Sequence, residues 1–312
     1  MGGGVLLLLA GAEALVRGAS ALALRFGISP LVVGLTVVAI GTSSPELVVT
    51  LGASLNGQGG VAVGNVVGSN IANLGLIIGV AAALKPVAVD RKLITHDLPV
   101  MLVGMALMVV ALLDGRLARW EGAVLTLGAI AYTADSIRSS RRETREAREV
   151  ELPPEVEAAL AESRSAVGKH ALFVLGGAAL LVYGANLLVD GAVETATLLG
   201  VSEAVVGLTL VALGTSLPEL ATTIVAAARG HGELALGNAI GSNIFNVFGV
   251  LGPASLLLPM DRGDVGDGSL AAMAGVAVLT FALLALGRRT ERWKGLVLLA
   301  SYVGYIAWVV GA

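Results

Sequence analysis

The residues best suited to ion chemistry are two glutamates, each in the middle of a long apolar segment. Glu46 ends the motif Gly-Thr-Ser-Ser-Pro-Glu and Glu219 ends the motif Gly-Thr-Ser-Leu-Pro-Glu. A carboxylate at the centre of a membrane helix costs about 3 kcal/mol on insertion scales, so such residues mark ion or proton pathways. Two carboxylates about 8 Å apart repel by ~2 kcal/mol at an effective dielectric of about 20, so an empty site should take up cations or protons.

The glutamates belong to a sequence unit that occurs twice, at a constant offset of 173 residues. Residues 32–47 and 205–220 are identical at thirteen of sixteen positions, and residues 64–79 and 237–252 at eight of sixteen. An unchanged offset across both blocks indicates duplication of a whole unit and not of a short motif. Each glutamate could instead be a protonated structural side chain. Its recurrence at equivalent places favours an ion site.

Residues whose oxygen atoms could bind a cation lie close to both glutamates in the sequence. Pro45 and Pro218 lack a backbone N–H, so we expect each helix to break there and to free backbone carbonyls. Freed carbonyls at membrane depth are tolerated only where they line a cavity or bind something. Hard cations such as Ca²⁺ take about 6–8 oxygen ligands, whereas zinc and copper favour nitrogen or sulfur ligands, which the motifs lack. The expected backbone and hydroxyl ligands are Ala39, Thr42, Ser43, Ala212, Thr215 and Ser216.

A second pair of segments can complete an oxygen shell without adding charge. Asparagine and serine recur there at a spacing of four residues, which places them on one helix face. We predict that Ser69, Asn73, Ser242 and Asn246 are ion ligands. We predict a structural role, holding helices together by hydrogen bonds, for Asn65, Asn70, Asn238 and Asn243.

The composition is that of a membrane protein. Of the 312 residues, 56% are hydrophobic and 14% charged, and the mean hydropathy is +0.87, whereas a soluble domain has about 25% charged residues. The absence of cysteine excludes disulfides and thiolate metal sites. The net charge of −3 gives no indication of a nucleic-acid partner, so we expect none.

A spanning helix needs roughly 20 apolar residues, and ten segments qualify. They lie near residues 4–25, 29–55, 60–84, 93–113, 118–138, 169–193, 201–228, 233–258, 269–287 and 294–311. Five crossings per copy force the second copy to enter the membrane the other way up. We therefore predict an all-α membrane protein of ten transmembrane helices in two inverted five-helix repeats, 1–138 and 169–312. Helices 2 and 7 are broken, and a linker at 139–168 joins the repeats.

The distribution of basic residues predicts the orientation. With the N-terminus outside, sixteen of the twenty Lys and Arg residues lie on the inner side and three on the outer side. This bias follows the positive-inside rule. It predicts a multi-pass protein with both termini extracellular and a cytoplasmic linker, and the compactness of the chain leads us to expect a plasma membrane. The charged linker is either a regulatory element or a solvated tether, and we favour the tether.

The paired motifs GTSSPEL…GNVVGSNIANLGLIIG and GTSLPEL…GNAIGSNIFNVFGVLG resemble the two internal repeats of the sodium/calcium exchangers, of the prokaryotic type, in the cation/calcium antiporter superfamily. The resemblance covers the whole chain. It implies alternating-access antiport of Ca²⁺ against Na⁺, in which Glu46 and Glu219 coordinate both ions in competition. The Na⁺ sites it implies are lined by Ser43, Ser216, Ser69, Ser242, Thr42, Thr215 and the carbonyls of Ala39 and Ala212.

One departure from some relatives concerns position 246. Relatives that carry aspartate there include potassium-dependent exchangers, and this chain has Asn246. Two carboxylates are balanced by one Ca²⁺ or two Na⁺, and a third Na⁺ would leave the site positive. We therefore predict electrogenic, K⁺-independent exchange, with no cofactor besides the transported ions. We expect a monomer in the lipid bilayer.

The first and sixth predicted helices also share the repeat offset. Gly11 and Gly18 match Gly184 and Gly191. The resemblance implies that this helix pair slides past the others to switch access. Arg17 aligns with Asp190, so we predict a salt bridge between the two helices. The alternatives pair Arg17 with the glutamate one turn before it, or let it reach the membrane surface.

Three other functions remain open. An H⁺/Ca²⁺ antiporter on the same scaffold is the main alternative, because glutamates also carry protons. A passive cation channel fits poorly with inverted broken helices around a midplane site. An intramembrane hydrolase fits least, because neither motif contains a histidine to activate a serine.

Overall fold

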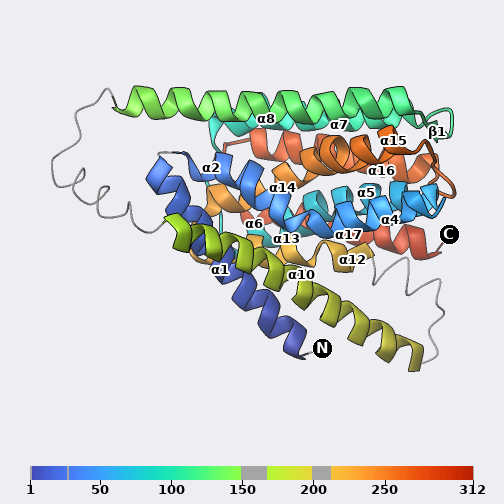
Figure 1. Cartoon of the computed structure of the whole chain (residues 1–312), viewed down its shortest axis with the longest axis horizontal. Coiled ribbons are helices and arrows are strands. Elements are labelled where there is room, and N and C mark those ends of the chain that lie inside the picture. Colours follow the sequence, from blue (N-terminus) through green and yellow to red (C-terminus); the bar gives the residue numbers. More distant parts are fainter. Residues whose placement is uncertain (1, 27, 149–166, 199–211, 312) are drawn as a thin grey trace.

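The structure is a computed structural model, and it describes residues 2–26, 28–148, 167–198 and 212–311. Most helices lie side by side along the long axis, and α1 and α10 cross on one flank (Figure 1). The first part of the chain forms α1 (Gly2–Phe26), α2 (Pro30–Val33), η1 (Gly34–Val38), α3 (Ala39–Thr42), α4 (Ser44–Leu55), α5 (Gly59–Ile71), η2 (Ala72–Ile77), α6 (Ile78–Leu84), η3 (Leu93–Asp97), α7 (Leu98–Ala111), β1 (Arg116–Leu117) and α8 (Arg119–Arg148). The second part forms α10 (Val167–Leu198), α12 (Ala212–Thr215), α13 (Leu217–Ala228), α14 (Gly232–Phe245), η6 (Asn246–Leu251), α15 (Gly252–Leu257), β2 (Met260–Asp261), α16 (Asp267–Ala285) and α17 (Arg292–Gly311).

The helices bear out a multi-pass membrane protein. Among the described residues, seven helices are long and apolar enough to cross a bilayer, or eight when one bent pair counts as a single span. The predicted fifth span lies in α8, which is not among these seven and continues through polar residues to Arg148. The predicted seventh span falls partly on residues 199–211, outside the described part. The count of ten therefore stays a prediction, as do the domain boundaries.

The predicted break in helix 2 is present. The segments Pro30–Thr42 and Ser44–Leu55 meet at an angle of 46°. Pro45 cannot donate to the carbonyl of Gly41, and the hydroxyl of Ser44 donates to that carbonyl instead, at 2.9 Å.

The carbonyl of Ala39, which we expected to be freed at this break, keeps its helical hydrogen bond. It accepts the backbone N–H of Ser43 at 2.9 Å. It keeps this bond because the missing donor, Pro45, faces a carbonyl two residues further on. In the second copy α12 ends at Thr215 and α13 begins at Leu217, and the N–H of Ser216 donates to the carbonyl of Leu213.

Two continuous helical segments form the centre of the molecule. α5–η2–α6 and α14–η6–α15 are buried along most of their length, whereas α1, α8, α10 and α17 expose large apolar side chains. Such exposed side chains suit contact with lipid. Each central segment contains a π-helical turn, η2 or η6, and such turns are frequent at functional sites. The turns include Asn73 and Asn246.

Strand pairs at the two ends of the bundle connect the halves. At one end β1 pairs with β2, so that Arg116 faces Asp261. A bridge between Ala88 and Arg289 joins the chain at the other end of α7 and α16. Adding 173 to one partner and subtracting 173 from the other converts the first pair into the second. The halves therefore make reciprocal contacts at opposite ends of the same two helices.

The helices α1 and α10 pack closely on each other through glycine. A Cβ atom on Gly11 would lie 2.8 Å from the carbonyl oxygen of Gly177, so the two backbones touch. The predicted bridge from Arg17 to α10 is wrong. Arg17 pairs with Glu13 at 2.5 Å, and Glu13 also pairs with Arg229 at 2.7 Å. Arg17 pairs with Glu13 because this carboxylate lies one turn away on the same helix.

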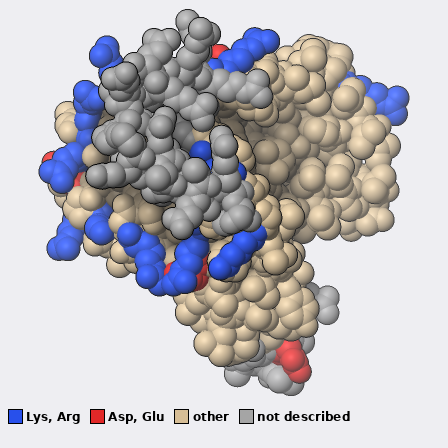
Figure 2. All heavy atoms as spheres, turned by 60° about the vertical axis from the view of Figure 1, so that its left-hand side comes forward, with Lys and Arg blue, Asp and Glu red and all other residues tan. Residues whose placement is uncertain are grey.

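Basic side chains gather at one end of the molecule. Figure 2 shows Lys and Arg side chains around the end where α8 ends and α10 begins, with most of the remaining surface in view uncharged. This is the end predicted to be cytoplasmic. Most of the predicted linker lies outside the described residues.

Candidate cation site

Glu46 and Glu219 begin two helices in the interior of the molecule. Each is the residue after the proline in the first turn of α4 or α13, and each is fully buried. The first turn of a helix carries unpaired N–H groups and the positive end of the helix dipole, which stabilise a carboxylate. The break before each proline thus places a helix start, and its glutamate, inside the protein.

Serines of the motifs join the two glutamates across the halves. The hydroxyl of Ser43 donates to Oε1 of Glu219 at 2.7 Å, and the hydroxyl of Ser216 donates to Oε1 of Glu46 at 3.4 Å. Each half therefore supplies the donor for the other half's carboxylate. The Oε2 atom of each glutamate is buried without a hydrogen-bond partner. Two buried carboxylates with unused oxygens are suited to binding a cation.

Further hydroxyls complete this group. Ser242 donates to Oε1 of Glu219 at 3.4 Å, and the hydroxyl oxygens of Ser69 and Thr215 lie 3.5 Å apart. A hydroxyl that donates its hydrogen keeps lone pairs for a cation. The helices α5 and α14 thus bring the two predicted serines, Ser69 and Ser242, to the motifs.

Two asparagines hold the motifs in place. Asn65 donates from Nδ2 to the carbonyl of Glu46 at 3.3 Å and to the hydroxyl of Thr50 at 3.1 Å, and it accepts from Thr215 at 3.3 Å. The second half repeats each bond, at 3.4, 3.0 and 3.1 Å, among Asn238, Glu219, Thr223 and Thr42. The structural role predicted for Asn65 and Asn238 is confirmed.

The asparagines predicted as ligands are fully buried and have unused polar atoms. Neither amide atom of Asn73 has a hydrogen-bond partner, and Oδ1 of Asn246 has none. Buried polar atoms are nearly always paired, so these oxygens need a partner such as a bound cation. Ala212, the remaining predicted ligand, begins α12.

Two threonines were missed in the sequence. Thr50 and Thr223 are fully buried and accept hydrogen bonds from Asn65 and Asn238. Both lie one turn after a glutamate and are related by the offset of 173, which is the signal that could have identified them.

Among the described residues of the site, the two glutamates carry the charge. Among the described residues, no group of three or more His, Cys, Asp and Glu side chains is arranged to hold a metal ion. The remaining oxygens of the site are neutral hydroxyls, carbonyls and amides. This set suits hard cations such as Ca²⁺.

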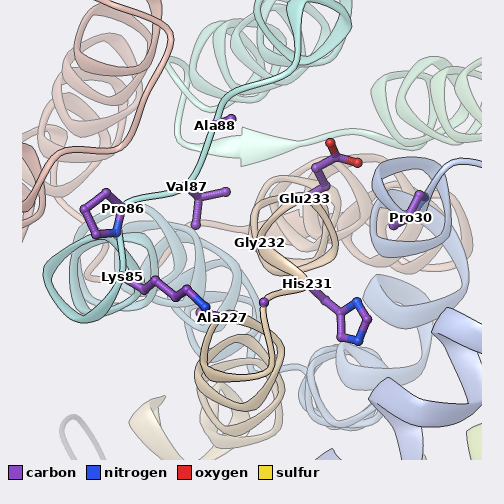
Figure 3. A pocket seen from close by; sticks show the side chains of 10 residues that line it. Pro30, Lys85, Pro86, Val87, Ala88, Ala227, His231, Gly232 and Glu233 are labelled. Atoms are coloured by element: carbon purple, nitrogen blue, oxygen red, sulfur yellow. The ribbon is translucent and has the colours of Figure 1, made fainter.

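A separate pocket of about 290 Å³ lies at the ends of α13 and α14 (Figure 3). Lys85, His231 and Glu233 line it, and their side chains do not converge on one point. None of the residues that line it belongs to the motifs that carry Glu46 and Glu219. The pocket is therefore not the cation site.

Comparison with known proteins identifies the family. The family profile described as "Sodium/calcium exchanger protein" matches residues 1–137 and 169–311. This chain belongs to the sodium/calcium exchanger family. The sodium/calcium exchanger MaX1 of Methanosarcina acetivorans is 35% identical over 333 residues, covering 97% of this chain and 95% of that protein. The inner membrane protein YrbG of Escherichia coli is 37% identical over 308 residues, covering 98% and 93%.

A solved structure of the sodium-calcium exchanger NCX_Mj has the same fold as this exchanger. The two superpose with a TM-score of 0.84 at 33% sequence identity, covering 98% of this chain and 96% of the other. This family member is accordingly a transporter and not an enzyme, and its activity is cation/calcium antiport.

Proposed function

We propose that this exchanger transports Ca²⁺ against Na⁺ by alternating access, with Glu46 and Glu219 as the shared ligands of both ions. The observation that carries the proposal is the pair of buried glutamates, each bonded to a serine of the opposite half. An ion between them touches both halves, so loading and release are coupled to their relative movement. The proposed neutral ligands are Thr42, Ser43, Ser69, Asn73, Thr215, Ser216, Ser242, Asn246 and the carbonyls of Ala39 and Ala212.

The charge count supports electrogenic exchange. Two carboxylates balance one Ca²⁺ or two Na⁺, and a third Na⁺ gives the site a net positive charge. The neutral ligands can hold a further Na⁺ without adding an acid. Exchange of three Na⁺ for one Ca²⁺ then moves one positive charge per cycle.

The amide at position 246 supports independence from K⁺. Asn246 supplies a neutral oxygen where a carboxylate would add a third negative charge. With two carboxylates, one Ca²⁺ already neutralises the site. Asn246 thus leaves out the third carboxylate that would attract a K⁺ ion beside Ca²⁺.

The reciprocal contacts support ten helices in two inverted repeats. A two-fold axis requires that each contact between the halves recurs with the partners exchanged. The bonds from Ser43 and Ser216, and the strand pairs at the two ends, obey this rule. The basic end (Figure 2) supports a cytoplasmic linker and extracellular termini in a plasma membrane. We propose that the monomer is the transporting unit, because one chain supplies both glutamates.

The proposal is tested by ⁴⁵Ca²⁺ uptake into proteoliposomes that contain the purified exchanger. An outward Na⁺ gradient in K⁺-free choline medium is expected to drive uptake, and added K⁺ is expected to leave the rate unchanged. Currents on a solid-supported membrane should show net charge movement in the Na⁺ direction. The double variant Glu46→Gln with Glu219→Gln is the inactive control.

Three results would overturn parts of the proposal. Absence of Na⁺-driven uptake by the wild type, with uptake driven by a pH gradient in Na⁺-free medium, would identify H⁺ as the coupling ion. Full activity of the double variant would refute the site assignment. A requirement for K⁺ would refute the charge count.

A further inference from the structure

We propose that Asn70 is a positioning residue that fixes the amide of Asn246 as a neutral ligand of the transported ion. The proposal rests on the proposed function, because it assigns a role within that ion site. Both side chains are fully buried, and Nδ2 of Asn246 donates to Oδ1 of Asn70 at 3.3 Å. The oxygen and nitrogen of a carboxamide share one plane, so a bond that holds the nitrogen also holds the oxygen.

Asn70 is itself oriented by a third helix. Its Nδ2 lies 3.8 Å from the sulfur of Met273, a fully buried residue of α16. A thioether sulfur accepts hydrogen bonds and cannot donate them. The nitrogen of Asn70 therefore faces Met273, and its oxygen is left to accept from Asn246.

The equivalent positions of the other half lack this arrangement. Asn243, the repeat counterpart of Asn70, donates to the carbonyl of Ala239 in its own helix at 2.7 Å. Its oxygen has no hydrogen-bond partner, and neither has any amide atom of Asn73, the counterpart of Asn246. The residue equivalent to Met273 is Val100, which offers no acceptor to Asn243. The difference between Met273 and Val100, outside the repeated motifs, thus fixes the amide of Asn246 and leaves the amide of Asn73 without a hydrogen bond.

The fixed amide has its oxygen available to an ion. Oδ1 of Asn246 is buried without a partner, and η6 packs against α4, which carries Glu46. A carboxylate at position 246 would instead meet the oxygen of Asn70, and two acceptors cannot share a hydrogen bond. Asn70 would then have to rotate and lose its contact with Met273. Asn70 therefore favours a neutral residue at position 246.

The test compares Asn70→Leu with the matched variant Asn243→Leu, which makes the same change in the other half. Asn70→Leu should raise the Ca²⁺ concentration for half-maximal uptake about tenfold and keep the maximal rate within about twofold. Asn243→Leu should change that concentration less than about twofold. Equal effects of the two variants would overturn the proposal.

A second pair of variants, with smaller changes in side-chain structure, keeps the test decisive if Asn70→Leu does not yield a monodisperse protein in detergent. Met273→Val gives α16 the residue found at position 100, and it should raise the half-maximal Ca²⁺ concentration about threefold. Val100→Met is the matched control and should not raise it. No change with Met273→Val would overturn the proposal.

A double-variant cycle separates positioning from a general packing effect. In the Asn246→Asp background, Asn70→Leu removes an acceptor that opposes the new carboxylate. It should therefore lower the half-maximal Ca²⁺ concentration in this background, although it raises that concentration in the wild-type background. A packing role predicts weakening in both backgrounds, and that result would overturn the proposal. Loss of Na⁺-driven uptake in the wild type would instead refute the proposed function.

Discussion

The two halves of the cation site contain almost the same residues and differ in their hydrogen bonds. Glu219 accepts from Ser43 at 2.7 Å, whereas the equivalent bond in the other half, from Ser216 to Glu46, is 3.4 Å long. Both carboxylates are equally buried. A duplicated motif therefore provides two acids whose hydrogen bonds from the opposite half differ in length.

The largest expected effect comes from substituting the glutamates themselves. It tests whether both carboxylate charges are needed to bind the ion, although their hydrogen bonds differ. Glu46→Gln and Glu219→Gln each remove one of two charges that balance the ion. Each should lower the initial rate of Na⁺-driven ⁴⁵Ca²⁺ uptake by about 100-fold or more, since bonds to a charged group contribute about 1.5–3 kcal/mol each. Near-normal uptake by either variant would show that its carboxylate does not bind the ion.

The serines give the sharpest comparison between the halves. Ser43→Ala removes the short bond to Glu219 and should raise the half-maximal Ca²⁺ concentration about tenfold, or ~1.4 kcal/mol. Ser216→Ala removes a longer bond to Glu46 and should raise it about threefold. Dose–response curves of uptake measure both. A larger effect of Ser216→Ala would reverse the ranking.

The asparagines that hold the motifs should show no such difference. Asn65→Leu and Asn238→Leu each remove three hydrogen bonds and leave buried partners unsatisfied, at a cost of about 2 kcal/mol. Both should lower the melting temperature in detergent by about 5 °C. Melting curves of the two variants, run beside wild type, test the symmetry. A difference of several degrees between them would contradict it.

The smallest expected effect concerns the helix break. Ser44→Ala removes the hydroxyl that donates to the carbonyl of Gly41, and the second copy already lacks it because Leu217 cannot donate. We expect a loss of about 1 kcal/mol in stability, a melting temperature lower by about 3 °C and uptake within twofold of wild type. A large loss of uptake would mean that this bond sets the geometry of the site.

Much of the fold and site could be predicted from the sequence because the repeat unit carries its own signals. Proline in an apolar run predicted the break, and the shared offset predicted that Glu46 and Glu219 act as a pair. The two predictions that failed depended on which hydrogen-bond donor or acceptor lies nearest in space. The carbonyl of Ala39 was expected to be free because the missing bond of Pro45 was assigned to the wrong residue, and Arg17 found a closer acid than Asp190. The bond from Asn246 to Asn70 also lacks a counterpart in the other half, and Met273, the acceptor beside Asn70, belongs to no motif.

The reciprocal strand pairs at the two ends have a consequence for the origin of the fold. A half-length ancestor, comprising one copy of the repeat, could make these contacts only with a second copy of itself. If the halves are inverted as we propose, that copy would sit in the same membrane in the opposite orientation. Ancestral chains of mixed orientation would then assemble into antiparallel homodimers, and gene fusion would fix one unit in each direction.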